Sequence, residues 1–521
     1  MRRVAAIVVI WVATSLAAGQ CIAQPPAAAE PVPPEAAKAE NAVAGKPAAW
    51  PQVGGGPGHT HAIAGELKVP MPLLWKHYTG YTEDNMSSPV VGGDRVFFAA
   101  AEVQQNRYVR HLYCLDRSTG ALIWKFDPRS KIIAGPAYQE GIVYVGTEDG
   151  KFYALDAATM EARGVGKWSL TVPRSIRGAP TIVEGRVIFG SSNKKVYALD
   201  AKTGEQKWSR PVSGDVTAAV AYGRGAIYVP CSSGEVFALG LDDGAVRWRR
   251  RVAVGRLELD LVVSGDRLYV VSGSEISALA LDNGARRWSQ RTPARITAPP
   301  AVSEQAVYIG CRDGMLYALK PANGEPIWQQ SLGSVITSAP LATNNAVLIG
   351  TRGPFLFALD AKSGKPLWKY RGWAPYPRFT GARYQIAGGP VTAQGGLYVL
   401  STDGNLYAFS PQSADARGPA MIAISPQQGQ TIRGWPPITL RVNIFDEGSG
   451  LDESSISVTL DGEAKQYNFD PTSGICTVEI KAVEGREEPL PDGPHTLKVS
   501  AKDALGNSGE YALIFYTKQA L

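Results

Sequence analysis

The chain has 521 residues, of which 56 are glycine and 37 are proline, and only 19% of its residues are charged. This length exceeds what one ordinary hydrophobic core supports, and the many glycines and prolines favour turns and short strands over helices. The net charge is only +6, and no basic run is interleaved with aromatic residues, so nothing resembles a nucleic-acid-binding fingerprint. We therefore expect an all-β protein with more than one domain and no nucleic-acid partner.

The N-terminus has the pattern of an export signal. Residues 1–23 begin with arginines after the first methionine, continue with an apolar run and end in small residues. A membrane-spanning helix needs about 20 apolar residues, and Gly19 and Gln20 interrupt the run too early. The pattern predicts a protein of the periplasm or the outer cell envelope. Cleavage after Ala23 would release the chain, whereas lipidation of Cys21 would tether it to a membrane.

The composition of the sequence after the signal changes near residue 48. Residues 24–47 are rich in Ala and Pro without periodicity, so we expect a disordered linker that buries no core. Beyond it stand His59 and His61, and two histidines at positions i and i+2 could share a metal on one strand face. No Cys, Asp or Glu is close in the sequence to complete such a site. We interpret both residues as loop histidines and predict no metal.

A thirteen-residue unit, Val196–Trp208, is repeated along the middle of the chain and reads VYALDAKTGEQKW. Near-copies end at Trp248, Trp288, Trp328 and Trp368. Successive tryptophans are 40 residues apart (248 minus 208), a period typical of four-stranded β-propeller blades. Within the unit, Asp200 can accept hydrogen bonds from turn amides and Gly204 tolerates a positive φ. Each repeat is therefore predicted to end in a hairpin whose outer strand carries the tryptophan.

The number of repeats predicts how the ring closes. Eight tryptophan strands meet eight Tyr-Ala-Leu-type strands, offset by half a repeat, and the last copy, Leu406–Phe409, has no tryptophan after it. The strand around Trp75 is thus expected to complete the last blade. We expect an eight-bladed β-propeller over residues 48–411, with these tryptophans packed between blades as structural docking residues: Trp75, Trp124, Trp168, Trp208, Trp248, Trp288, Trp328 and Trp368.

The eighth repeat carries an insertion that reads RGWAPYPRFTGAR from Arg371 to Arg383. Insertions in propellers lie in loops on the faces of the ring, and aromatic residues and arginines dominate binding hot spots. We therefore select as candidate binding residues Arg371, Trp373, Tyr376, Arg378, Phe379 and Arg383. The alternative is a proline-stiffened loop that only covers the ring closure.

A different pattern begins near residue 418. Residues 418–521 contain short strands of alternating polarity with turn signals such as Asp461-Gly462, which predicts a β-sandwich of about 100 residues. An acidic group in this region could hold calcium, but its spacing matches no calcium loop, so we interpret as solvated turns Asp446, Glu447, Asp452 and Glu453. The cysteines after the signal show neither a disulfide framework nor zinc spacing.

The repeat carries a resemblance to a known superfamily. The unit from Tyr197 to Trp208 resembles the tryptophan-docking repeat of pyrroloquinoline-quinone (PQQ)-dependent dehydrogenases and their non-enzymatic relatives, and the resemblance covers about residues 48–411. It implies an eight-bladed propeller with the tryptophans between blades. The C-terminal motifs at Pro491–Leu497 and Asp503–Asn507 are similar to bacterial immunoglobulin-like modules.

Two functions follow from this resemblance. As a scaffold, the chain resembles the propeller lipoproteins of the outer-membrane β-barrel assembly machinery, which dock partner proteins. As an enzyme, it would be a quinoprotein dehydrogenase with the quinone and calcium on the propeller axis. Such enzymes have an adjacent cysteine pair, which this sequence lacks, and Asp260 is the one out-of-pattern acid on an inner strand. We expect a monomeric scaffold with protein partners in the cell envelope, without catalytic residues or cofactors, and keep the dehydrogenase as the alternative.

Overall fold

The structure is a computed structural model that describes residues 51–79, 88–104, 107–159, 167–372, 385–386, 388–481 and 489–520. Over these residues the chain forms strands and no helix, which confirms the predicted all-β class. It follows that the described part holds no helix long and apolar enough to cross a membrane. The predicted export signal, with Cys21, and the linker up to residue 47 lie outside the described residues.

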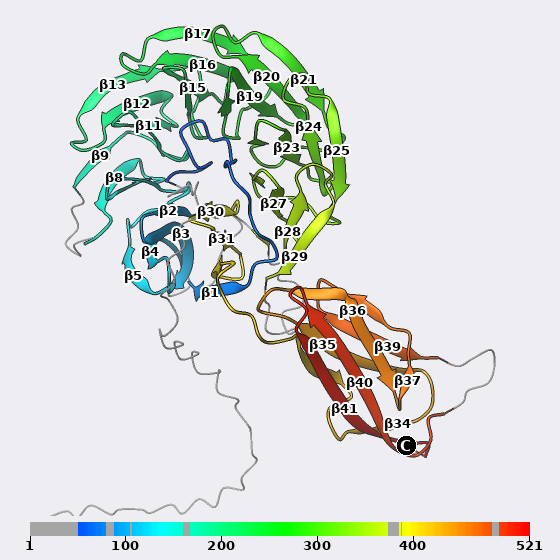
Figure 1. The fold of residues 1–521 in the computed structure, drawn as a ribbon. Coiled ribbons are helices and arrows are strands. Elements are labelled where there is room, and N and C mark those ends of the chain that lie inside the picture. Colours follow the sequence, from blue (N-terminus) through cyan, green and yellow to red (C-terminus); the bar gives the residue numbers. More distant parts are fainter. Residues whose placement is uncertain are drawn as a thin grey trace, which may run out of the picture. The chain divides into compact units, whose positions relative to one another are not determined.

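Among the described residues between Leu73 and Phe409, eight four-stranded antiparallel sheets follow one another in a propeller-like arrangement (Figure 1). Seven of them consist of four consecutive strands each. The first three are β2 (Val90–Gly92), β3 (Arg95–Gln104), β4 (Arg107–Asp116), β5 (Leu122–Phe126); β6 (Ala137–Gln139), β7 (Ile142–Gly146), β8 (Lys151–Asp156), β9 (Trp168–Thr171); and β10 (Thr181–Val183), β11 (Arg186–Ser191), β12 (Lys195–Asp200), β13 (Gln206–Pro211). The next four are β14 (Ala221–Gly223), β15 (Ala226–Pro230), β16 (Glu235–Gly240), β17 (Val246–Arg251); β18 (Val262–Ser264), β19 (Arg267–Ser272), β20 (Glu275–Ala280), β21 (Arg286–Arg291); β22 (Ala301–Val302), β23 (Val307–Gly310), β24 (Met315–Leu319), β25 (Pro326–Ser331); and β26 (Leu341–Ala342), β27 (Ala346–Gly350), β28 (Phe355–Asp360), β29 (Pro366–Arg371).

The remaining propeller sheet joins the two ends of the repeat region. It contains β30 (Val391–Ala393), β31 (Gly396–Leu400) and β32 (Asn405–Phe409), and its outer strand is β1 (Leu73–Tyr78). In the antiparallel register, Trp75 lies opposite Ala408 and Tyr78 opposite Asn405. The strand around Trp75 therefore supplies the outer strand that the last hairpin lacks.

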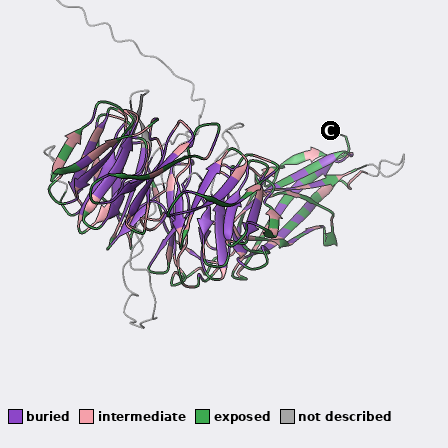
Figure 2. Cartoon of the chain, turned by 90° about the horizontal axis from the view of Figure 1, so that it is seen from above, coloured by how far each residue is buried: buried purple, intermediate pink, exposed green. Residues whose placement is uncertain are grey.

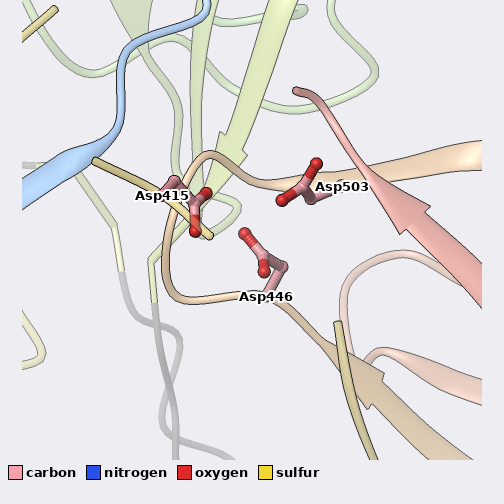
Figure 3. Close-up of side chains that lie close together, drawn as sticks. All are labelled: Asp415, Asp446 and Asp503. Carbon is pink, nitrogen blue, oxygen red and sulfur yellow. The ribbon is translucent and has the colours of Figure 1, made fainter. Parts of the chain in front are cut away.

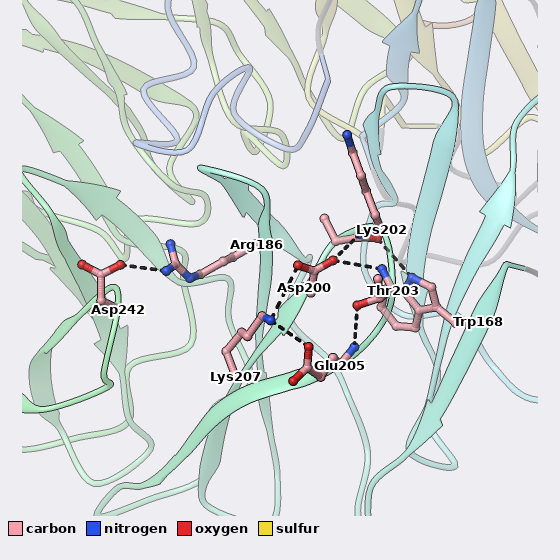
Figure 4. Close-up of polar contacts among 9 residues, drawn as sticks. Trp168, Arg186, Asp200, Lys202, Thr203, Glu205, Lys207 and Asp242 are labelled. Carbon is pink, nitrogen blue, oxygen red and sulfur yellow. Dashed lines mark hydrogen bonds and ion pairs between the residues drawn. The ribbon is translucent and has the colours of Figure 1, made fainter.

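Contacts between neighbouring sheets repeat along the chain. In six successive sheets the indole N–H of the outer-strand tryptophan donates to a carbonyl 33 residues later, as from Trp208 Nε1 to Leu241 O at 2.8 Å. The Trp208 ring also covers Gly244, where a Cβ atom would lie 2.7 Å from the ring. In each turn an acidic or amide side chain accepts amide hydrogen bonds, as Asp200 does from Lys202 and Thr203 (Figure 4). The constant spacing of the unit within this chain thus produces the same contact between neighbouring sheets in these six repeats.

Two further sheets follow the propeller. One has the order β33 (Ala420–Ser425), β35 (Ile438–Phe445), β39 (Ile475–Ile480), β38 (Asn468–Asp470). The other has the order β34 (Thr431–Arg433), β41 (Ser508–Lys518), β40 (Gly493–Asp503), β36 (Leu451–Leu460), β37 (Glu463–Ala464). Both contribute to one hydrophobic core that includes Leu440, Val499 and Phe515.

Burial distinguishes these C-terminal sheets from the propeller sheets (Figure 2). Strand β15 is buried at all five positions, because neighbouring sheets cover both of its faces. Strand β35 instead alternates between buried residues and more accessible ones, because only one face meets a core. The cysteines of the described chain are buried and free: Cys114, Cys231, Cys311 and Cys476.

Candidate functional site

The segment that precedes β1 runs along the inner strands of the propeller. Figure 1 shows this segment in dark blue inside the ring of sheets. Inner-strand amides donate to its carbonyls: Tyr138 N to Pro51 O, Tyr222 N to Pro57 O, Val263 N to Gly58 O, Val302 N to Thr60 O and Ala342 N to His61 O, at 2.6–2.9 Å. The buried Gln52 side chain accepts a further amide hydrogen bond from Ile182 at 2.8 Å. We call residues 51–66 the channel segment, since they touch six inner strands in succession.

Two histidines of the channel segment are buried among the sheets. Both lie outside strands, in keeping with the interpretation as loop histidines, but His59 is 0% exposed and His61 is 4% exposed, so the loop is buried. Both have positive φ values, 54° and 49°, a backbone conformation that non-glycine residues seldom adopt. Tight hydrogen bonding of this segment to the inner strands holds them there.

The protonation of His59 follows from its hydrogen bonds. The Thr181 hydroxyl donates its proton to Val220 O, so it must accept from His59 Nε2, which lies 3.2 Å away. His59 Nδ1 is then unprotonated, and it has no partner among the described residues. Burial lowers the pKa of His59 to about 4, which keeps the ring neutral near pH 7.

His61 lies close to an acid that the sequence does not place beside it. Burial and the charge of His59 lower the pKa of His61 to about 4, and the charge of Asp260 opposes this shift. Burial in turn raises the pKa of Asp260, whose Oδ1 accepts from Ala219 N at 2.7 Å. Asp260 thus lies near the channel segment, although it is 199 residues from His61 in sequence (260 minus 61).

The channel does not fit a quinone with calcium on the propeller axis, at least at the positions that the structure describes. The inner-strand amides facing the axis already donate to the main chain of residues 51–66. The neighbouring side chains, Gln52 and His59, are bonded to Ile182 and Thr181. A flat cofactor would have to displace this segment and leave those amides without acceptors.

The candidate binding loop is described only at its start. Arg371 is the last residue of β29 and is largely buried, and burial lowers the pKa of its guanidinium while the charges of Asp470 and Glu453 oppose the shift. It packs against Gly474 of the C-terminal sheets. The other five candidates, Trp373, Tyr376, Arg378, Phe379 and Arg383, lie outside the described residues.

The C-terminal sheets contact β29 and β1 through the loop between β35 and β36. Trp368 Nε1 donates to Ser449 O at 2.7 Å, so a C-terminal carbonyl accepts the bond that a propeller turn accepts elsewhere. Leu73 N donates to Gly448 O at 3.0 Å and the Tyr370 hydroxyl donates to Glu447 O at 3.2 Å. The last docking tryptophan thus attaches the C-terminal sheets to the propeller.

The four acidic residues that are close together in sequence, Asp446, Glu447, Asp452 and Glu453, have different partners in the structure. Glu447 pairs with Lys76 at 3.2 Å and Glu453 pairs with Lys369 at 2.6 Å, whereas Asp452 accepts from Ser454. Glu447 and Glu453 therefore join the two parts of the protein, and the group forms no common site with Asp446.

Comparison with known proteins identifies relatives of this fold. The sequence matches the family described as outer membrane protein assembly factor BamB over residues 109–310 and 272–435. Quinohemoprotein alcohol dehydrogenase from Comamonas testosteroni is 17% identical, over 75% of this chain and 83% of that chain, with a TM-score of 0.59. A europium-containing methanol dehydrogenase is 16% identical, over 68% of this chain and 89% of that chain, with a TM-score of 0.56. BamB from Moraxella catarrhalis is 16% identical, over 65% of this chain and 99% of that chain, with a TM-score of 0.51. Identities this low indicate a shared fold alone, and no curated protein matches the sequence.

Proposed function

Because the chain belongs to the family of the outer membrane protein assembly factor BamB, we propose that it is an exported, non-enzymatic scaffold of the bacterial cell envelope. In this role it binds other proteins, in outer-membrane protein assembly, and resides in the periplasm or the outer envelope after removal of residues 1–23. The family relationship supports a propeller scaffold.

The channel segment is the observation that carries this proposal. The resemblance to quinoprotein dehydrogenases implies a quinone with calcium on the propeller axis, whereas in this chain the inner strands bind residues 51–66. Buried, neutral histidines and the bonded Gln52 side chain complete this packing. Because residues 51–66 occupy the inner strands, we place partner binding on the faces and loops of the propeller.

We further propose a division of the chain into domains. The eight propeller sheets would be the eight blades of a closed ring over residues 48–411, and residues 418–521 an immunoglobulin-like sandwich. The ring is supported by the pairing of β1 with β32, and the sandwich by the core shared between its two sheets.

Titration of the purified protein with PQQ in the presence of Ca²⁺, followed by quinone absorbance and calorimetry, is expected to give no saturable quinone binding. The physical reason is that the inner-strand amides are already bonded to the channel segment. Binding in the micromolar range or tighter would overturn the scaffold proposal and favour a dehydrogenase. In that case, loss of binding in Asp260→Asn would place the quinone in the channel.

Pull-down from intact cell envelopes tests the proposed partner surface, residues 373–383, without Arg371, which packs against Gly474. Trp373→Ala and Arg378→Ala are expected to reduce the recovered partners several-fold, because buried aromatic and arginine side chains dominate binding energy. Arg249→Ala is the matched control, since Arg249 is exposed on β17 at a distance from this loop in sequence. Recovery at the wild-type level in both loop variants would exclude this loop as the contact.

A further inference from the structure

Three aspartates from separate parts of the chain meet beside the loop that joins the C-terminal sheets to the propeller (Figure 3). Asp415 lies in the connection after β32, Asp446 directly follows β35, and Asp503 ends β40. One carboxylate oxygen from each lies within 4.8 Å of the others. Two oxygens bound to the same Ca²⁺ at 2.3–2.6 Å can be at most about 5 Å apart, so the three carboxylates are close enough to share one ion.

The charges of this cluster are not balanced by the protein. Across the described residues, no Lys or Arg forms an ion pair with any of the three carboxylates. Asp503 is only 2% exposed. Burial raises the pKa of Asp446 to about 6, and the charges of Asp415 and Asp503 add to this effect although the Gly450 amide opposes it. Three carboxylates brought together in this way repel one another, and either a proton on one of them or a cation between them relieves the repulsion.

Unpartnered polar atoms in the cluster and in the loop that follows Asp446 provide a second observation. Asp415 Oδ2 is enclosed by protein and accepts no hydrogen bond from the described residues. The Ser449 hydroxyl, in the loop that follows Asp446, is 0% exposed and also has no partner there. Buried polar groups are nearly always bonded, and a bound ion or water is one way to satisfy an enclosed carboxylate oxygen that has no donor.

The local backbone is shaped around the carboxylates. Gly448 faces the Asp415 carboxylate so closely that a side chain at this position would collide with it. Asp503 is held by the amides of Leu505 and Asn507, and Asn507 Nδ2 also donates to Asp415 O at 3.0 Å. Each carboxylate offers about four acceptor positions, so these bonds orient the side chains and leave oxygen lone pairs for an ion.

We propose that Asp415, Asp446 and Asp503 bind one Ca²⁺ ion, which fixes the C-terminal sheets to the propeller. Oxygen ligands of irregular arrangement suit Ca²⁺, which accepts six to eight oxygens, better than Mg²⁺, which requires a near-octahedral shell. Main-chain carbonyls and water supply the remaining ligands. The ion joins the connection after β32 to the loop that accepts hydrogen bonds from Leu73 and Trp368. It therefore reinforces contacts that already connect the two parts, and it does not depend on the scaffold function proposed above.

Calorimetric titration of the chelator-treated full-length mature protein with CaCl₂ tests the site. We expect one saturable site per chain, with a dissociation constant of roughly 0.1–1 mM or tighter, the range of extracellular calcium modules. Asp446→Asn and Asp415→Asn should each weaken binding at least tenfold, because each removes a charged ligand. Asp452→Asn, on the exposed part of β36, is the matched control and should bind as the wild type does.

Limited proteolysis provides the readout for the junction. Ca²⁺ should protect the connection at residues 411–419 in the wild type and in Asp452→Asn, and Mg²⁺ at the same concentration should protect it less. Asp415→Asn changes one side chain in this connection, so it serves as the variant least able to disturb either core. Absence of saturable Ca²⁺ binding in the wild type, or binding equal in Asp415→Asn and Asp446→Asn to that of the wild type, would overturn the proposal.

Discussion

Replacing Trp208 with alanine is expected to lower the free energy of unfolding by about 3–5 kcal/mol, the range for truncation of large core side chains. The Trp208 ring is 9% exposed and packs on Gly244 of the next sheet. Its loss leaves a cavity between two sheets, and it leaves the Leu241 carbonyl without the donor that lies 2.8 Å away. Urea unfolding followed by circular dichroism measures the change.

Trp208→Phe separates the contribution of ring packing from that of the hydrogen bond to the Leu241 carbonyl. The phenyl ring keeps part of the contact with Gly244 but lacks the N–H, so the loss should be smaller than for alanine. Trp248→Ala should cost less than Trp208→Ala, since Trp248 is only partly buried. An unchanged unfolding midpoint in Trp208→Ala, together with altered ligand binding, would instead assign these tryptophans to a binding site.

The repeated sheets could be predicted from the sequence because every signal is local. Asp200, Gly204 and Trp208 lie within nine residues of one another, and Trp208 bonds to a carbonyl 33 residues later in the next repeat. The pairing of Trp75 with Ala408 could also be predicted, since counting left one strand unpaired at each end of the repeat. In a repeat protein each repeat packs against the next one in the sequence, so contacts between neighbouring sheets can be predicted from the repeat alone.

The channel segment could not be predicted, because its partners are distant and follow no period. Gln52 bonds to Ile182, 130 residues away, and His61 lies near Asp260. Around His59 and His61 the sequence shows several glycines, and its nearest acid is Glu66, a composition that is typical of a loop. The one available signal was Asp260, an acid where several other repeats have proline, which the structure places two residues before the inner strand β18 and not within it.

The aspartate cluster could not be predicted from the sequence either. Grouping acids by sequence put Asp446 with Glu447 and Glu453, which pair with lysines of β1 and β29. Its partners in space are Asp415 and Asp503, which span 88 residues (503 minus 415). Long-range contacts bring them together: Ala504 N donates to Gly450 O beside Asp446, and Asn507 Nδ2 donates to Asp415 O. No sequence period indicates these contacts.

Acid is expected to destabilise the protein through the channel histidines. Burial lowers the pKa of His59 from 6.5 to about 4 in the folded protein. Between these values the unfolded chain binds a proton that the folded protein does not bind, so the stability present above pH 6.5 is lost as the pH falls towards 4. A pKa difference of this size corresponds to about 3 kcal/mol from His59. Urea unfolding at steps between pH 7 and pH 4 measures the loss.

A variant assigns this loss to one ring, because other groups in the channel also titrate. His61 has the same direction of shift as His59, whereas the raised pKa of Asp260 favours the folded protein at low pH. His59→Gln does not titrate and can still donate to Thr181, so its stability should fall less steeply between pH 6.5 and pH 4. Because a neutral donor replaces a neutral donor, the two proteins should differ little at pH 7. If the stability of His59→Gln depends on pH as steeply as that of the wild type, protonation of His59 is not the cause of the acid destabilisation.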